Sequence, residues 1–128
     1  MNQPPTVVIL RESDPRPELQ IVKGDGVARA LVWPGVGAEL RSMQSIMLRA
    51  GSTTLALQHP MEAVYYVVAG SGVAVDLDGT DSFDVNEGSM VHVEPGTRYE
   101  FQAGDDGIEI LGGPCPADHA LYNGIAGQ

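Results

Sequence analysis

Four side chains near the middle of the chain are of the types that transfer protons or hold metal ions. They are His59, Glu62, Tyr65 and Tyr99. An imidazole titrates near neutral pH, so it can act as a general base or as a metal ligand. A phenol donates a hydrogen bond or a proton to an oxygen, and burial gives a carboxylate a raised pKa suited to proton transfer. These residues predict acid–base chemistry on a small molecule if the fold brings them into one pocket.

Short strands separated by tight turns must position these side chains. The chain contains 16 Gly and 9 Pro, which interrupt short runs rich in Val, Ile, Thr and Tyr. The expected strands cover residues 6–10, 19–23, 27–33, 40–48, 52–58, 64–68, 73–77, 82–85, 89–93, 98–101 and 108–111. No region shows sustained helical periodicity, although residues 117–122 can form one helical turn. This repeated pattern of short strands and turns predicts an all-β antiparallel sandwich or barrel.

The alternation of side chains along the strands indicates which residues enter the interior. Successive residues of a strand point to opposite faces of the sheet. Tyr65 and Gln44 are therefore expected to face the pocket, whereas Tyr66 is expected on the outer face. By the same alternation, Val91 and His92 point to opposite faces, so packing or a subunit contact is expected for His92.

Composition narrows the class of protein and its partners. A length of 128 residues with 43% hydrophobic residues predicts a single domain covering residues 1–128. The net charge of −10 and only seven Lys and Arg disfavour binding to nucleic acid or to an anionic membrane. Cys115 is the single cysteine, so no internal disulfide can form, and a reducing cytoplasmic location is expected. The sequence shows no signal peptide and no apolar stretch long enough to span a membrane.

Four glycines lie at the spacings of two known motifs. Gly51 and Gly70 begin and end the pattern G-x5-H-x-H-x3-E-x6-G without gaps. Gly88 and Gly96 take the glycine positions of G-x5-P-x-G-x2-H-x3-N. In this frame the chain resembles the cupins, over about residues 40–112, with its core motifs in residues 51–104. The resemblance implies a cupin-type double-stranded β-barrel (jelly roll) with extra N-terminal strands and a central pocket.

Other residues occupy most of the metal-ligand positions of the cupin motifs. Leu57, His59, Ala63 and Tyr99 stand where the family has His, His, Glu and His. A first-row metal usually needs three protein ligands, and only His59 matches the family pattern. The resemblance therefore leaves open both one divalent metal (Fe, Zn or Mn) and no metal. In the same frame His59 and Tyr99 lie at the centre of the site, and Leu57 lies where it contacts a substrate.

A local similarity to ectoine synthase, an iron-dependent cupin cyclase, suggests another ligand set. Residues 59–65, with the sequence HPMEAVY, are similar to the corresponding segment of that family, in which the Glu binds the metal. If a bulge turns Glu62 inward, His59, Glu62 and Tyr99 provide one nitrogen and two oxygen ligands. The other two ligand positions of that family are Val91 and Tyr99 here. The similarity thus implies a related fold more strongly than ectoine formation.

Two classes of function are consistent with these residues. In the first, the protein is a lyase, isomerase or cyclase, with His59 as base or ligand, Tyr99 as acid or oxyanion donor, and Glu62 as second carboxylate. Its substrate contacts are then Tyr65, Gln44, Leu57 and Val91. In the second, the protein is a non-catalytic cupin that binds a small metabolite or acts as an interaction module. The loss of two ligand positions favours this second class, whereas the acid–base side chains favour the first, and the enzyme is the preferred interpretation.

The resemblance also implies a homodimer. Cupins of this size pair through their N-terminal strands, which here correspond to residues 6–10 and 19–23. An exchange of these edge strands across a two-fold axis covers backbone groups that are otherwise unpaired.

Overall fold

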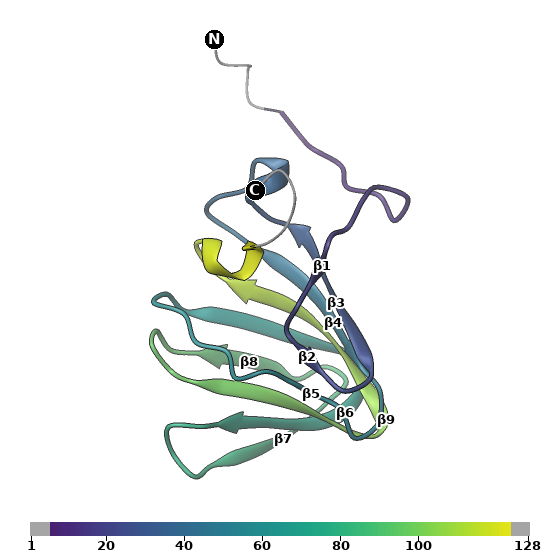
Figure 1. Cartoon of the computed structure of the whole chain (residues 1–128), viewed down its shortest axis with the longest axis vertical. Helices are drawn as coiled ribbons and strands as arrows, with labels where there is room; N and C mark the ends of the chain where they lie inside the picture. The colour runs from purple at the N-terminus through teal and green to yellow at the C-terminus, as the bar shows by residue number, and fades with distance from the viewer. Residues whose placement is uncertain (1–5, 124–128) are drawn as a thin grey trace.

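Nine β-strands and two short 3₁₀ helices make up the computed structural model, which describes residues 6–123 (Figure 1). The strands are β1 (Glu18–Leu19), β2 (Val22–Lys23), β3 (Gly26–Val32), β4 (Met43–Leu48), β5 (Thr53–Thr54), β6 (Ala63–Asp76), β7 (Ser82–Asn86), β8 (Met90–Val93) and β9 (Tyr99–Pro114). The 3₁₀ helices are η1 (Pro34–Val36) and η2 (His119–Tyr122). In the described part of the chain, no helix is long and apolar enough to cross a membrane.

Two long antiparallel strands, β6 and β9, hold the barrel together. They pair from Ala63 opposite Pro114 to Asp76 opposite Tyr99. The first half of β6 also pairs with β8, and its second half pairs with β7. The last part of β9 pairs with β4, whereas its first part pairs with β5. Each long strand therefore runs through both faces of a double-sheet barrel (Figure 1), which confirms the predicted all-β jelly roll.

Glycines allow β6 and β9 to bend from one face of the barrel to the other. The register shifts between Gly70 and Gly72, where residues 104–107 of β9 have no partner on β6. Gly70 has a φ of +80°, and a Cβ atom there would lie 2.1 Å from the carbonyl oxygen of Gly107. A Cβ atom on Gly72 would lie 2.1 Å from the carbonyl oxygen of Gln102. The two backbones thus approach more closely than any side chain permits.

Alternating side chains fill the interior between the two faces. On β6, Ala63, Tyr65 and Val67 are buried, whereas Val64 and Tyr66 are exposed. This pattern confirms the orientations predicted for the two tyrosines. The interior also receives the buried side chains Gln44, Ile46, Leu48, Tyr99, Phe101, Ile108 and Ile110 from β4 and β9.

Several predicted strand boundaries are wrong. Residues 64–68 and 73–77 belong to one strand, β6, and residues 98–101 and 108–111 belong to one strand, β9. Their glycines read as turns in the sequence, but they are bends within continuous strands. Residues 6–10 form no strand, because no neighbouring backbone pairs with them, and Val7 is 81% exposed. Residues 19–23 are divided between β1 and β2, which pair with β3 and β5 of the same chain.

Candidate active site

A line of four hydrogen-bonded side chains crosses the interior of the barrel. The Asp118 carboxylate lies 2.7 Å from Nδ1 of His59, and Nε2 of His59 lies 2.9 Å from the phenol oxygen of Tyr99. The phenol oxygen of Tyr99 lies 2.5 Å from that of Tyr65. His59, Tyr65 and Tyr99 are each at most 4% exposed. Three of the four residues predicted at the site are therefore in contact, and we call Asp118, His59, Tyr99 and Tyr65 the relay.

Backbone hydrogen bonds place His59 beside the start of β9. Leu57 and Tyr99 form an isolated bridge, in which the Leu57 amide donates to the Tyr99 carbonyl at 2.7 Å and the Tyr99 amide donates back at 2.9 Å. The Gly96 amide donates to the carbonyl of His59 at 2.8 Å. Alternation along β6 turns Tyr65 toward the same point. Tyr65 and Tyr99 thus lie on paired strands, and His59 is held two residues beyond the Leu57 bridge.

The chain after β9 supplies Asp118, which sequence reasoning missed. Its other carboxylate oxygen accepts the Ala120 amide at 3.1 Å and so caps η2. Tyr122 ties this segment down, because its hydroxyl donates to the Gln44 side chain at 2.9 Å and its ring packs 5.1 Å from that of Trp33. An Asp before an expected helical turn is a local capping signal. No local signal shows that it also reaches an imidazole 59 positions earlier.

The relay has one arrangement of protons that uses every donor. An ionised Asp118 accepts the Nδ1 hydrogen of His59, so Nε2 has no hydrogen and accepts one from Tyr99. The oxygen of Tyr99 then accepts the hydroxyl hydrogen of Tyr65. We assign this tautomer from the hydrogen-bond network. The order carboxylate, imidazole, hydroxyl is the order found in hydrolase triads, with a phenol in place of serine.

Burial keeps both phenols of the relay protonated. Removal from water raises the pKa of Tyr65 well above its ordinary value of about 10. Burial likewise raises the pKa of Tyr99, and the neighbouring Tyr65 and the Asp118 charge raise it further. A phenolate is therefore not a resting state of this site. Both tyrosines act as neutral hydrogen-bonding groups near neutral pH.

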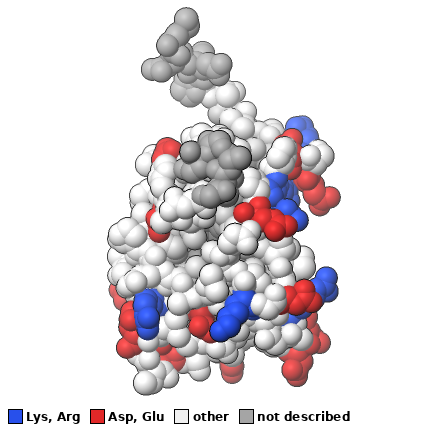
Figure 2. Space-filling model, in the orientation of Figure 1, with Lys and Arg blue, Asp and Glu red and all other residues white. Residues whose placement is uncertain are grey.

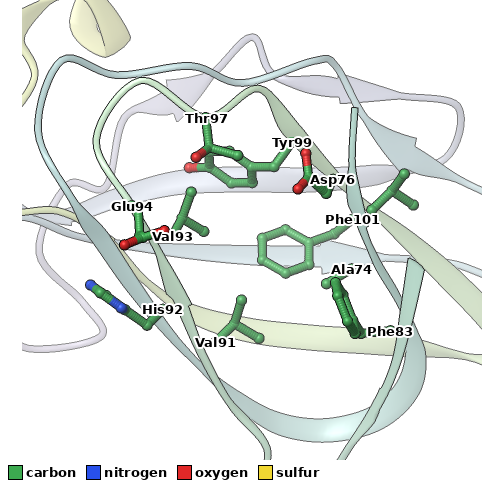
Figure 3. A pocket seen from close by; sticks show the side chains of 11 residues that line it. Ala74, Asp76, Phe83, Val91, His92, Val93, Glu94, Thr97, Tyr99 and Phe101 are labelled. Carbon is green, nitrogen blue, oxygen red and sulfur yellow. The ribbon is translucent and has the colours of Figure 1, made fainter. Parts of the chain in front are cut away.

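Tyr99 also lines a cavity of about 170 Å³ between the two faces of the barrel (Figure 3). Its walls come from β6, β7, β8, β9 and the turn before β9. Val91 lines this cavity, as the sequence predicted, whereas His59, Tyr65, Leu57 and Gln44 are not among its lining residues. Leu57 and Gln44 are buried, and Gln44 holds Tyr122. Of the relay residues, Tyr99 is thus the one that meets the cavity.

The expected position of Glu62 is wrong. Glu62 is exposed, and its carboxylate lies 2.9 Å from Nε2 of His92 on the outer surface. The reason is the register: Ala63 begins β6 facing inward, so its neighbour faces outward. No bulge turns Glu62 inward beside His59.

The residues present do not fit a divalent metal ion. Because Glu62 lies outside, the set of His59, Glu62 and Tyr99 is not assembled. Within residues 6–123 no group of three His, Cys, Asp or Glu side chains could hold a metal ion. Both nitrogens of His59 already have partners, and the raised pKa of Tyr99 opposes the phenolate that a metal needs.

We expect the purified protein to bind no divalent metal through His59. Titration with Zn²⁺, Mn²⁺ or anaerobic Fe²⁺ should give the same weak uptake for the wild type and for His59→Ala, measured by calorimetry and elemental analysis. Glu62→Ala is the surface control and should also match the wild type. Near-stoichiometric metal that disappears in His59→Ala alone contradicts this prediction.

Comparisons with known proteins define the family. The cupin domain family matches residues 45–111, which is more than half of the chain. This chain therefore belongs to the cupin family, as the sequence resemblance implied, and its double-sheet barrel agrees with that. No curated protein sequence matches it significantly.

Solved structures share this fold at low sequence identity. A predicted oxalate decarboxylase from Thermotoga maritima aligns with a TM-score of 0.69 and 19% identity, over 86% of this chain and 100% of that one. The polyketide cyclase RemF from Streptomyces resistomycificus aligns with a TM-score of 0.62 and 20% identity, over 90% of this chain and 80% of that one. Ectoine synthase from P. lautus aligns with a TM-score of 0.60 and 17% identity, over 79% of this chain and 69% of that one. At such identities the likeness establishes the fold and not the reaction.

Proposed function

We propose that this protein is an enzyme that performs acid–base chemistry on a small molecule bound in the barrel cavity. The reaction is of the lyase, isomerase or cyclase type, in which a proton moves without redox change. The observation that carries the proposal is the unbroken line of hydrogen bonds from Asp118 through His59 to Tyr99, which is one of the residues that line the cavity. Cyclase and synthase activities among the cupins of similar fold support this class of chemistry.

The relay can accept a proton without forming a phenolate. As the oxygen of Tyr99 takes a proton from the ligand, its own hydrogen passes to Nε2 of His59 across 2.9 Å. The imidazolium that results is paired with the Asp118 carboxylate, which offsets the cost of a buried charge. Return of the proton to another atom of the ligand completes an isomerisation or an elimination. Tyr65 keeps the Tyr99 oxygen in place throughout.

In this scheme the roles differ from those expected for the sequence alone. Tyr99 is the catalytic residue, because it meets the ligand, and His59 is the proton store behind it. Asp118 and Tyr65 are positioning residues. Glu62 has no part in the step, because it is on the outer surface.

A non-catalytic, ligand-binding cupin is the second candidate. One observation favours it: His59 is buried and is not among the residues that line the cavity. In that case the relay serves only to hold the barrel together, and the cavity binds a metabolite without changing it.

Hydrogen–deuterium exchange separates the two candidates without knowledge of the natural substrate. A panel of small carbonyl, hydroxy and amino compounds is incubated with the protein in D₂O, and the loss of C–H signals is followed by NMR. We expect exchange into at least one bound compound, and Tyr99→Phe should slow it about a hundredfold, a typical contribution of one acid–base group. Tyr66→Phe removes an exposed phenol and is the matched control.

Asp118→Asn tests the positioning role in the same assay. The amide no longer favours the tautomer with hydrogen on Nδ1, so the exchange should slow and its pH profile should shift. Compounds that bind but never exchange in the wild type establish the binding function instead. A Tyr99→Phe variant as fast as the wild type overturns the relay.

A further inference from the structure

The barrel cavity has room for about one ring. Its volume is about 170 Å³. A protein cavity of about 150 Å³ is large enough to hold benzene. One ring therefore fits inside, and because the cavity is partly open, any larger part of a ligand extends out of it. An ion of one or two atoms leaves most of the space empty.

Aromatic side chains form a large part of the wall. Phe83 on β7 and Tyr99 and Phe101 on β9 line the cavity (Figure 3), although Phe101 is fully buried. The rings of Tyr99 and Phe101 are nearly perpendicular, at 83°, with centroids 6.0 Å apart. This is the edge-to-face contact that aromatic pairs prefer, and an aromatic face at a cavity wall attracts a cation.

Charged groups at the cavity are mainly negative. Asp76 and Glu94 line it, and no Lys or Arg does. One oxygen of Asp76 accepts the amides of Asp78 and Gly79. Glu94 is exposed at the rim. These carboxylates repel an anion and attract a cation in the same space.

The nearest basic side chains have carboxylate partners on the outer surface. Arg98 lies 3.4 Å from Asp78 and does not line the cavity. His92 lines the cavity, but its ring is directed away from the phenyl rings (Figure 3) and meets Glu62. Figure 2 shows acidic side chains over the lower part of this face, with fewer basic ones among them. The surface around the cavity adds no strong attraction for an anion.

We infer that the cavity binds a small organic cation with a single ring, such as an arylalkylamine in its ammonium form. The ring lies against Phe83 and Tyr99, and the charge faces Asp76 and Glu94. This inference rests on the proposed function in placing the ligand beside Tyr99, and it names the class of that ligand. Carboxylate substrates of the same size bind more weakly because the two carboxylates repel them.

Three probes of one shape and different charge test the inference. Benzylammonium, benzyl alcohol and benzoate are titrated into the full chain and followed by calorimetry and by NMR of the aromatic side chains. Benzylammonium should bind about tenfold more tightly than benzoate, with benzyl alcohol between them, because two carboxylates attract the first and repel the last. Added salt should reduce this difference.

Variants locate the binding. Glu94→Gln should weaken the binding of benzylammonium about threefold, the size expected for a partly exposed ion pair. The affinity for benzyl alcohol should not change. Glu12→Gln changes the net charge equally from the exposed N-terminal segment and should have no effect. Phe83→Ala, at a side chain that is 58% exposed, should weaken all three probes without unfolding the barrel.

Each outcome decides between the inference and the proposed function. Benzoate binding as tight as that of benzylammonium, or binding of neither, overturns the inference. Loss of affinity in Glu12→Gln equal to that in Glu94→Gln also overturns it. Tyr99→Phe keeps its ring and should still bind benzylammonium. If it binds but exchanges protons as fast as the wild type, the proposed function fails and the inference stands.

Discussion

Above about pH 10 the free energy of unfolding should fall by up to about 4 kcal/mol for each pH unit. Burial raises the pKa of Tyr65, Tyr99 and Tyr122 in the folded protein above the value of about 10 expected in the unfolded chain. Between these values the unfolded chain releases protons that the folded protein retains. The unfolded state then binds fewer protons, so stability decreases as pH rises. Each buried tyrosine lowers the free energy of unfolding by about 1.4 kcal/mol per pH unit in this range.

Denaturant unfolding at about pH 9, 10 and 11, followed by circular dichroism, measures this slope. Stability should be nearly constant below the unfolded pKa of about 10 and should then drop steeply. Tyr99→Phe removes one of the three buried phenols, so its slope should be about two thirds of that of the wild type. The control Tyr66→Phe should keep the full slope. A stability that does not change over this range means that the phenols are not buried as described.

Gly70→Ala should lower the free energy of unfolding by about 4 kcal/mol, and a chain this small can then fail to fold. Gly70 has a φ of +80°, and an alanine in this conformation lowers the free energy of unfolding by about 1–2 kcal/mol. The new methyl group would also lie 2.1 Å from the Gly107 carbonyl oxygen, and overpacking of this kind costs a further 1–3 kcal/mol. The clashing atom belongs to the backbone of β9, so it cannot move aside as a side chain does.

Gly88→Ala is the matched control for this prediction. Gly88 has a similar φ of +93°, but nothing lies within 4 Å of the position of its Cβ atom. The control should therefore lose only the conformational cost of about 1–2 kcal/mol. Equal losses in the two variants, measured by denaturant unfolding, show that the approach of β6 to β9 is not as close as described.

Local pattern was enough to predict the fold class and part of the site. Alternation along β6 assigned Tyr65 to the interior and Tyr66 to the exterior, because one face of each strand is buried. The spacing of four glycines led to the cupin frame, which placed His59 and Tyr99 together. These are statements about strand register and turns, and residues near in sequence determine both.

Long-range contacts could not be predicted in the same way. Gly70 and Gly72 resemble turn residues, and only the pairing of β6 with β9 shows that they are bends. Asp118 completes the relay through a contact with His59 that no periodicity reveals. The error at Glu62 has the opposite cause. A local similarity suggested a bulge, but the regular register of β6 leaves this carboxylate in solvent.

The position of Asp118 in the chain has a consequence for biosynthesis. On a ribosome, the imidazole of residue 59 emerges long before β9 and the carboxylate of residue 118. A nascent chain therefore carries an imidazole and a phenol that have no fixed tautomer or orientation. Their ordering must wait until β9 has joined both faces and η2 has docked. The complete relay therefore exists only after the segment that carries Asp118 has docked against His59.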